Sequence, residues 1–136
     1  MNDVSRRVKD LAARDYFVTL LGAECVDAGP GTAVVRMTVR EQHMNFNGTC
    51  HGGVLFSLAD SAFGLASNSH GRLAVAVDAH IGFTAPVRVG DELIATAREL
   101  NRSNRIGTYR VDVRRADDAM VATFTGTVYV TRREHP

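Results

Sequence analysis

The residues that could carry chemistry in this chain are concentrated between positions 45 and 60. Residues 45–53 read NFNGTCHGG, and a largely apolar run follows them as far as Asp60. The first N–H groups of a helix have no intrahelical acceptor and carry partial positive charge, so a helix that starts at the Gly pair could hold a developing oxyanion. Asp60 is the only formally charged residue between His51 and Arg72. An ionised carboxylate there is costly unless something uses it, so the segment indicates hydrolysis of an activated acyl group.

The spacing of these groups limits how a single helix could use them. Gly52 and Asp60 are eight residues apart. In a helix they would lie about 12 Å apart along the axis and about 80° apart in rotation. An Asp side chain is too short to close that gap, so one helix cannot easily present both groups to the same carbonyl. We therefore expect a composite site at a two-fold dimer interface, with Gly52 from one subunit and Asp60 from the other.

Acyl chemistry suggests a role for each polar group of the segment. The Gly52 N–H would polarise the carbonyl and hold the oxyanion. Asp60 would act as general base on water or attack the carbonyl directly, and the sequence leaves both routes open. Asn45 would orient the carbonyl or the attacking water, with stabilisation of a turn as the alternative. His51 would hold the loop or the Gly52 peptide through a hydrogen bond, and a structural role is as well supported as a catalytic one.

Hydrophobic periodicity predicts the elements that position this segment. One helix is expected over residues 4–21, ended by Gly22. A long helix over about 53–68 is apolar on nearly all sides and is therefore expected to be buried. The predicted strands are residues 33–40, then an antiparallel meander of 73–84, 92–100, 107–115 and 120–132. We expect an α+β architecture in which one curved antiparallel sheet wraps the central helix, with dimers packed into a homotetramer to complete its burial.

Length and composition limit the number of domains, the partners and the cellular compartment that can be expected. The length of 136 residues fits one domain, residues 1–136, and the net charge of +1 gives no general case for nucleic acid or a membrane surface. The polar start of the chain is unlike a signal peptide, so a cytoplasmic protein is expected. Cys25 and Cys50 form no disulfide or zinc pattern, and no His pair has metal-like spacing with a third ligand, so no metal is expected. Cys50 beside His51 lacks a third catalytic partner, which favours a small buried residue.

Asn45, His51, Gly52, Gly53 and Asp60 together form the pattern Asn-x5-His-Gly-Gly-x6-Asp. This pattern resembles hotdog-fold acyl-CoA thioesterases, and it looks closest to the PaaI type, named for phenylacetate degradation. The order of segments 31–40, 45–71 and 73–131 extends the resemblance over nearly the whole chain. The resemblance implies the hotdog fold, catalytic positions at Asp60, Gly52, Asn45 and His51, and composite sites in a dimer. Many relatives carry Gln and Glu at the positions of Asn45 and Asp60, so this Asn/Asp pair is what points to the PaaI type.

The substrate is indicated less directly than the reaction. The resemblance alone favours phenylacetyl-CoA or its ring-hydroxylated derivatives, with coenzyme A as part of the substrate and no separate cofactor. Gly53 is expected to lie against the substrate. Candidate walls for an aromatic acyl group, with core packing as the alternative for most of them, are Phe46, Phe56, Phe63 and Phe83. Candidate ligands for the CoA phosphates, with solvated surface charge as the alternative, are Arg88, Arg102, Arg105 and Arg110.

Two other functions remain open at this point. Hotdog dehydratases or hydratases act on acyl thioesters and usually rely on a reactive His, whereas the helix here supplies Asp60, which favours hydrolysis. A non-catalytic acyl-CoA-binding module would have no need of Asp60 and usually carries an output domain, for which this chain has no room.

Overall fold

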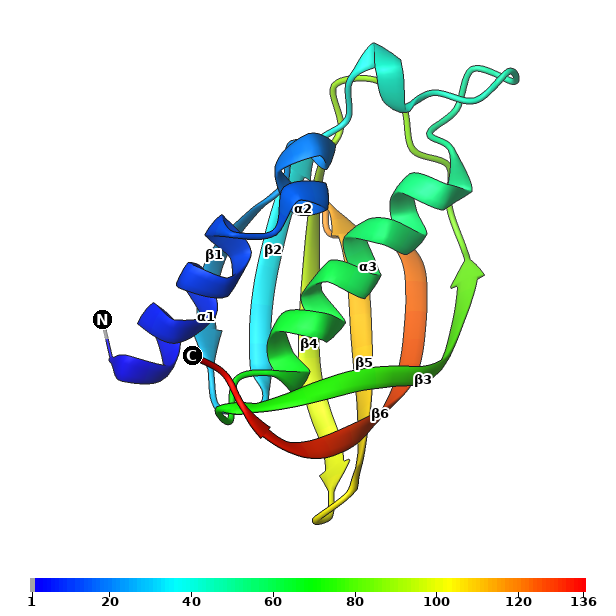
Figure 1. Ribbon diagram of the computed structural model, residues 1–136. Helices are drawn as coiled ribbons and strands as arrows, with labels where there is room; N and C mark the ends of the chain where they lie inside the picture. Colours follow the sequence, from blue (N-terminus) through cyan, green and yellow to red (C-terminus); the bar gives the residue numbers. More distant parts are fainter. Residues whose placement is uncertain (1) are drawn as a thin grey trace.

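A long helix lies against the concave face of a curved antiparallel sheet in the computed structural model, which describes residues 2–136 (Figure 1). The helix is α3 (Gly52–Ser67). The strands are β1 (Glu24–Gly29), β2 (Thr32–Thr38), β3 (Arg72–Phe83), β4 (Glu92–Arg102), β5 (Ile106–Arg115) and β6 (Met120–Glu134). Two short helices, α1 (Asp3–Ala13) and α2 (Tyr16–Leu21), precede the sheet, and a 3₁₀ turn, η1 (Glu41–His43), precedes α3. The predicted α+β architecture is confirmed.

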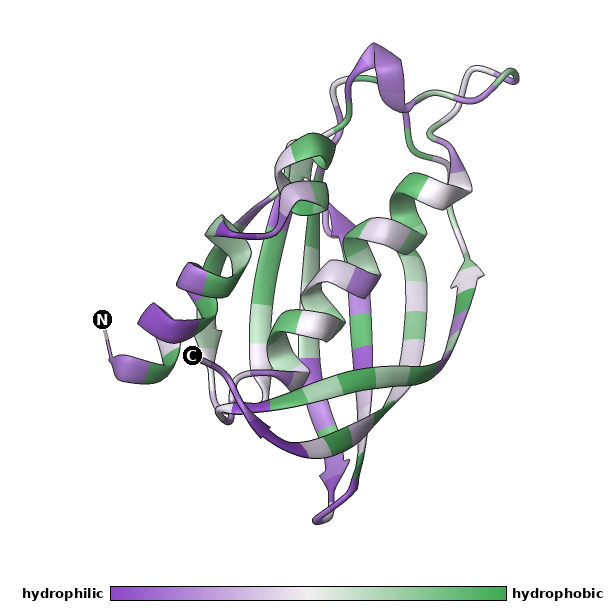
Figure 2. Cartoon of the chain, viewed as in Figure 1, coloured by the Kyte–Doolittle hydropathy of each residue, from purple (hydrophilic) through white to green (hydrophobic). Residues whose placement is uncertain are grey.

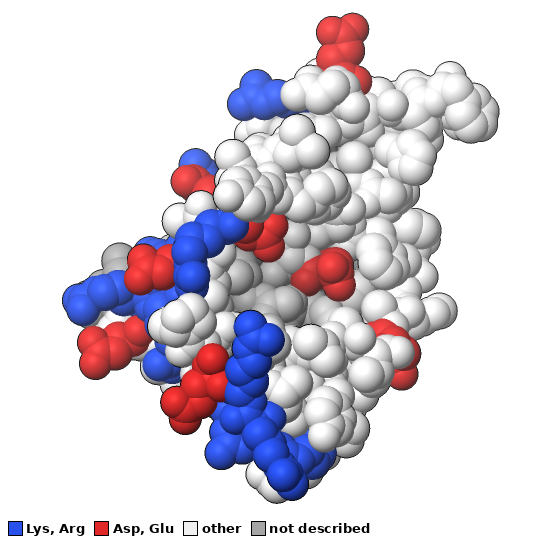
Figure 3. All heavy atoms as spheres, in the orientation of Figure 1, with Lys and Arg blue, Asp and Glu red and all other residues white. Residues whose placement is uncertain are grey.

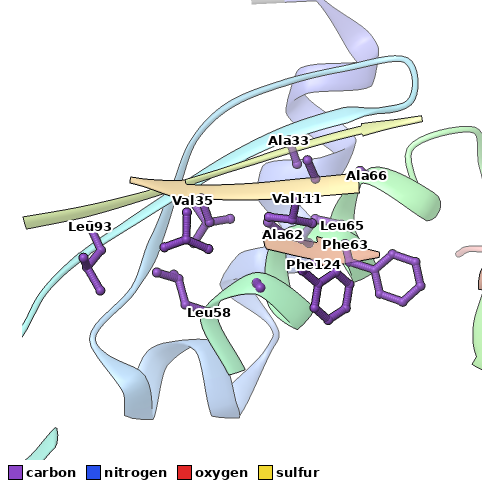
Figure 4. Packing of buried hydrophobic residues seen from close by; sticks show 14 of the residues in the cluster. Ala33, Val35, Leu58, Ala62, Phe63, Leu65, Ala66, Leu93, Val111 and Phe124 are labelled. Carbon is purple, nitrogen blue, oxygen red and sulfur yellow. The ribbon is translucent and has the colours of Figure 1, made fainter. Parts of the chain in front are cut away.

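The period-two alternation of the strands places one apolar face of the sheet on α3. Hydrophilic residues gather in α1 and toward the β4–β5 turn, whereas hydrophobic residues recur along the central strands and α3 (Figure 2). Leu58, Ala62 and Phe63 of α3 pack against the sheet in the fully buried core (Figure 4). The Phe63 ring lies 5.3 Å from the ring of Phe124, centroid to centroid, and a Cβ on Gly126 would come within 2.7 Å of it. The absence of a side chain at Gly126 therefore lets α3 sit close to β6.

The N-terminal helical region differs from the single helix predicted over residues 4–21, because Asp15 interrupts it. Asp15 Oδ1 accepts hydrogen bonds from the N–H groups of Phe17 (3.0 Å) and Val18 (3.1 Å), and it thereby starts α2 as a separate helix. Gly22 ends α2 in the left-handed conformation, at φ 78°, as predicted. No helix within residues 2–136 has the length and apolarity that crossing a bilayer requires.

The order of the strands corrects the predicted meander. The sheet order is β1-β2-β4-β5-β6-β3, so β3 crosses over to pair with β6 instead of lying beside β4. The strand β1 was not expected, because only Ala28 in it is buried and its sequence does not alternate cleanly. The predicted boundaries of the other strands and of α3 agree with the structure to within two residues.

The strand β3 forms one edge of the sheet and is exposed over most of its length. Its only strand neighbour within residues 2–136 is β6. Val75 and Val77 are 43% and 59% exposed, although both are apolar. An open edge with apolar side chains favours pairing with a further strand.

Candidate functional site

The loop that leads into α3 is shaped by Asn45. Its Oδ1 accepts hydrogen bonds from the N–H groups of Asn47 (2.8 Å) and Thr49 (3.2 Å), and its Nδ2 donates to the Thr49 hydroxyl at 3.1 Å. A backbone bond from Asn45 N–H to the Thr49 carbonyl closes the turn. These contacts use both acceptor positions of the amide oxygen and one of the two amide protons. Asn45 therefore stabilises the turn in the single chain, and its predicted role toward a substrate remains a prediction.

His51 caps the start of α3. Its Nδ1 accepts a 2.8 Å hydrogen bond from the Gly53 N–H, and its carbonyl accepts one from Val54 N–H. A Cβ on Gly53 would lie 2.9 Å from His51 Nδ1, so glycine at position 53 makes room for the ring. Because Nδ1 accepts here, the neutral ring carries its proton on Nε2. His51 was expected to hold the loop or the Gly52 peptide, and in the structure its ring accepts from the Gly53 N–H.

Gly52 is the first residue of α3, and its backbone faces Phe83. With the Gly53 N–H committed to His51, the Gly52 N–H has no acceptor among residues 2–136. A Cβ on Gly52 would lie 3.2 Å from the tip of the Phe83 ring, which is itself 54% exposed at the end of β3. An uncommitted helical N–H beside an aromatic side chain has the properties expected of an oxyanion donor with one apolar wall.

Asp60 lies on the side of α3 that faces away from the sheet. It lines a groove of about 660 Å³ together with the start of α2, the C-terminal half of α3 and His135. Charged side chains flank a hollow beside α3, whereas the surface over the loop and the start of α3 carries hardly any charge (Figure 3). Desolvation by the surrounding chain raises the pKa of Asp60, and the negative charge of Asp15 raises it further. Within residues 2–136 no Lys, Arg or His forms an ion pair with this carboxylate.

The two catalytic candidates on α3 therefore lie in separate surroundings within one chain. Gly52 does not line the groove that contains Asp60. An unpaired carboxylate with a raised pKa is suited to take a proton or to attack a carbonyl. The Gly52 N–H is suited to receive the resulting oxyanion. Within one chain, therefore, the carboxylate and the N–H that an acyl-transfer site would need lie in different places.

The four phenylalanine candidates lie in different surroundings. Phe56 packs edge-to-face on Phe124, with ring centroids 5.6 Å apart, so core packing is its role in the chain. Phe63 is likewise in the core. Phe46 is fully exposed at the loop tip, and Phe83 lies at Gly52. Of these four phenylalanines, Phe83 is the one whose ring a Cβ on Gly52 would meet first.

The arginine candidates do not form one phosphate site in the single chain. Arg88 lies in the turn before β4, where its N–H donates to Asp91. That turn adjoins the loop that leads into α3 through a bond from Cys50 N–H to the Val87 carbonyl. Arg105 lies in the β4–β5 turn, at the opposite end of the sheet, and donates to the Val130 carbonyl at 3.2 Å (Figure 1). A site that used both arginines would have to draw them from two chains.

The groove also contains residues that the sequence did not single out. Tyr16 and Phe17, at the start of α2, line it beside Asp60, and Asp15 lies at the same wall. Phe17 falls within the single helix that was predicted over residues 4–21. The available signal was Asp15 itself, a strong N-cap residue type within that helical pattern.

Cys50 is not an alternative nucleophile. Cys50 is buried, and its desolvation together with the charge of Asp91 raises the pKa of the thiol to about 11. The thiol therefore stays protonated near neutral pH, and the prediction of a small buried residue is confirmed. No cluster of three or more His, Cys, Asp or Glu side chains in residues 2–136 could hold a metal ion.

The family follows from a match with known proteins. The model of the family described as "Thioesterase superfamily" matches residues 47–122, which is more than half of the chain. The chain therefore belongs to the thioesterase superfamily. Acyl-coenzyme A thioesterase PaaI from Escherichia coli is 42% identical to this thioesterase over 112 residues, covering 82% of this chain and 80% of that protein. The predicted enzyme class, a thioester hydrolase, is thereby confirmed.

Solved structures agree with this family and with the hotdog fold of the thioesterase. The structure of E. coli PaaI superposes with a TM-score of 0.92 at 34% identity, covering 97% of this chain and 99% of that one. The TT0310 protein from Thermus thermophilus superposes with a TM-score of 0.82 at 46% identity, covering 85% and 97% of the two chains. The resemblance to the PaaI type that the motif indicated is confirmed.

Proposed function

We propose that this thioesterase hydrolyses acyl-CoA thioesters to a free acid and CoA, and that phenylacetyl-CoA or its ring-hydroxylated derivatives are its substrates. The observation that carries the proposal is the unpaired Asp60 carboxylate in a groove of about 660 Å³. The relatives support the CoA ester. The smu.793 protein of Streptococcus mutans, 28% identical, was solved bound to acetyl CoA, and a Streptococcus pneumoniae thioesterase, 26% identical, with coenzyme A. The E. coli PaaI protein comes from a phenylacetic acid degradation operon, which supports the arylacetyl group.

The active form in this proposal is a homodimer with composite sites, and two dimers pack into a homotetramer. The exposed apolar edge of β3, at Val75 and Val77, supports the pairing of two sheets edge to edge. The separate surroundings of Gly52 and Asp60 within one chain support a site shared between subunits. Coenzyme A enters as part of the substrate, and the reaction needs no further cofactor. The cytoplasm is the compartment we propose for it.

The reaction can follow either of two balanced routes. In the first, Asp60 takes a proton from water while the water oxygen bonds to the thioester carbon. In the second, an Asp60 oxygen bonds to that carbon, and water later cleaves the resulting mixed anhydride. In both routes the Gly52 N–H of the other subunit holds the oxyanion, the C–S bond breaks, and the CoA thiolate leaves and takes up a proton. Both routes require the ionised form of Asp60.

The direct test is thiol release from phenylacetyl-, hydroxyphenylacetyl-, benzoyl- and straight-chain acyl-CoAs. We expect fast turnover of the arylacetyl esters and a loss of about 10²- to 10⁴-fold in kcat for Asp60→Asn, which keeps the shape of the side chain but removes the base. Ser57→Ala is the matched control, because its hydroxyl is bonded within α3, to the Gly53 carbonyl, and it does not line the groove. Wild-type protein that releases no thiol from any ester contradicts the proposed activity. Full activity of Asp60→Asn contradicts the role of Asp60.

The composite site has a separate test in mixed dimers. Gly52→Pro and Asp60→Asn chains with different tags are co-expressed, and the mixed dimer is purified through both tags. In a composite arrangement one of its two sites carries both changes and the other carries neither, so about half of the wild-type activity per dimer returns. Mixed dimers as inactive as the two parents would refute the shared site.

A further inference from the structure

The helix α2 turns its first two side chains toward the groove of Asp60. Tyr16 is 92% exposed and Phe17 is 52% exposed, although α2 carries buried residues as well. Both aromatic side chains line the groove on the side opposite α3. We infer that Tyr16 and Phe17 form the wall that selects the acyl group of the substrate and favours a flat aromatic acyl group over a straight chain. This inference rests on the proposed thioesterase function and adds two specificity residues to it.

The aromatic pair is held in place by the ends of its helix. Asp15 Oδ1 caps the first turn through the N–H groups of Phe17 and Val18, and Gly22 closes the helix. Val18 and Leu21 are 3% and 6% exposed and anchor α2 to the core. A six-residue helix has little intrinsic stability, so these caps and anchors fix where the backbone that carries the two rings lies. The backbone of the wall is therefore preorganised before substrate binds.

The opposite wall of the groove leaves room for a flat group. Leu11, Leu65 and Leu73 line it with aliphatic surface. Gly64 lies among them, and a Cβ at that position would meet nothing within 4 Å, so the groove is open beside α3. A phenyl ring between aromatic and aliphatic walls buries both of its faces, whereas a linear chain cannot stack on Tyr16 or Phe17. An aromatic contact contributes about 0.5–1.5 kcal/mol beyond the area that it buries.

The position of the pair relative to Asp60 decides which part of the substrate it meets. The thioester carbonyl must lie at Asp60, and its carbon carries the acyl group on one side and the CoA sulfur on the other. The apolar side chains that line the groove beside Asp60, Leu11, Phe17 and Leu65 among them, suit a phenyl ring better than the polar chain of CoA. Phe83, by contrast, lies at Gly52, near the oxyanion donor. The acyl group therefore meets Tyr16 and Phe17. If the pair contacted the CoA portion instead, its loss would weaken all thioesters alike.

The test compares Tyr16→Leu and Phe17→Leu with Leu20→Ala. Leu20 is a matched control, because it is 78% exposed on the same helix and does not line the groove. For each variant, kcat/KM is measured for phenylacetyl-CoA and hexanoyl-CoA. We expect the ratio of the two to fall about 2- to 12-fold in each aromatic variant, which is the aromatic contact energy converted to a rate ratio. The Leu20→Ala variant should keep the wild-type ratio.

Binding gives a second readout that does not depend on turnover. Dissociation constants are measured for the non-hydrolysable thioethers S-(2-phenylethyl)-CoA and S-hexyl-CoA. We expect the aromatic variants to lose the preference for the phenylethyl compound by the same factor. An unchanged preference in both aromatic variants, an equal change in Leu20→Ala, or an equal loss for both ligands overturns the inference. If the wild type cleaves no thioester, the proposed function fails on its own, and the thioether comparison still decides whether α2 selects the aromatic group.

Discussion

Most hydrogen bonds around Gly52 join residues close in sequence, such as Asn45 with Thr49 and His51 with Gly53. The groove around Asp60 is assembled instead from α1, α2, α3, the start of β3 and His135 near the C-terminus. The two catalytic candidates lie on the same helix, yet one is positioned by a local loop and the other by packing of distant elements. Damage to the fold should therefore affect the two regions unequally.

The largest effect, on kcat, is expected at Gly52, in the region that the local loop positions. Gly52→Pro removes the N–H, while proline is well tolerated at the first position of a helix. The preceding residue, His51, already has the extended backbone that precedes proline, with φ −60° and ψ 133°. Loss of one oxyanion donor should lower kcat for phenylacetyl-CoA by about 10²- to 10³-fold. The measurement is steady-state thiol release, with circular dichroism to confirm that the fold is retained.

Gly52→Ala is the matched control for that variant. It keeps the N–H and adds a Cβ at about the same place, 3.2 Å from the exposed Phe83 ring, which can move aside. Its kcat should stay within a few-fold of the wild type. Equal losses in the alanine and proline variants would mean that crowding of Phe83, and not the N–H, accounts for the effect.

A smaller effect, on the free energy of unfolding, is expected when the packing of α3 against β6 is disturbed. Gly126→Ala would place a Cβ 2.7 Å from the buried Phe63 ring. Overpacking of this kind costs about 1–3 kcal/mol of unfolding free energy, measured by denaturant unfolding. Gly82→Ala is the control, because its Cβ would make an ordinary 3.6 Å contact with Thr123. Equal stability of the two variants would show that the packing of α3 on β6 does not depend on the absence of a side chain at position 126.

The contrast between the regions also explains which features the sequence could predict. The motif loop, α3 and five of the strands follow from turn residues and from periods of 2 and 3.6, which are local properties of the chain. The capping contact of His51 follows from the same local pattern. The place of β3 beside β6 depends instead on how the sheet closes around α3, which no local pattern records.

The same limit on prediction from local sequence patterns applies to single residues of the groove. Phe17 fits an apolar helical stripe, and only the cap made by Asp15 turns it toward Asp60. Phe56 has the same residue type and a place closer to the motif, yet it packs on Phe124 in the core. Residue type and distance in sequence therefore did not identify the aromatic wall, because the wall is set by the packing of α2.

A still smaller effect on stability is expected from loss of the His51 cap. It separates a structural role of His51 from a catalytic one. His51→Ala removes the cap on the Gly53 N–H, and loss of a helix cap typically costs about 0.5–2 kcal/mol of stability. His51→Asn should restore most of that stability, because Asn is a favoured capping residue. Activity restored along with stability would assign His51 to positioning of the loop. Stability restored without activity would place the His51 ring in contact with the reaction, and an unaltered stability of His51→Ala would contradict the capping role.

The smallest expected effect tests the electrostatics of the groove. The charge of Asp15 raises the pKa of Asp60, so Asp15→Asn should lower that pKa. In the proposed reaction the ionised Asp60 is the active form, so the acid limb of the kcat/KM profile should move to lower pH, with the plateau above it nearly unchanged. Asn retains the ability to cap α2, so the unfolding free energy should change little. Burial and nearby arginines lower the pKa of His135, so its ring is neutral near pH 7, and Asp15 is the charged group whose field raises the pKa of Asp60. An acid limb that stays in place, or moves to higher pH, would show that Asp15 does not act on Asp60 in the assembled enzyme.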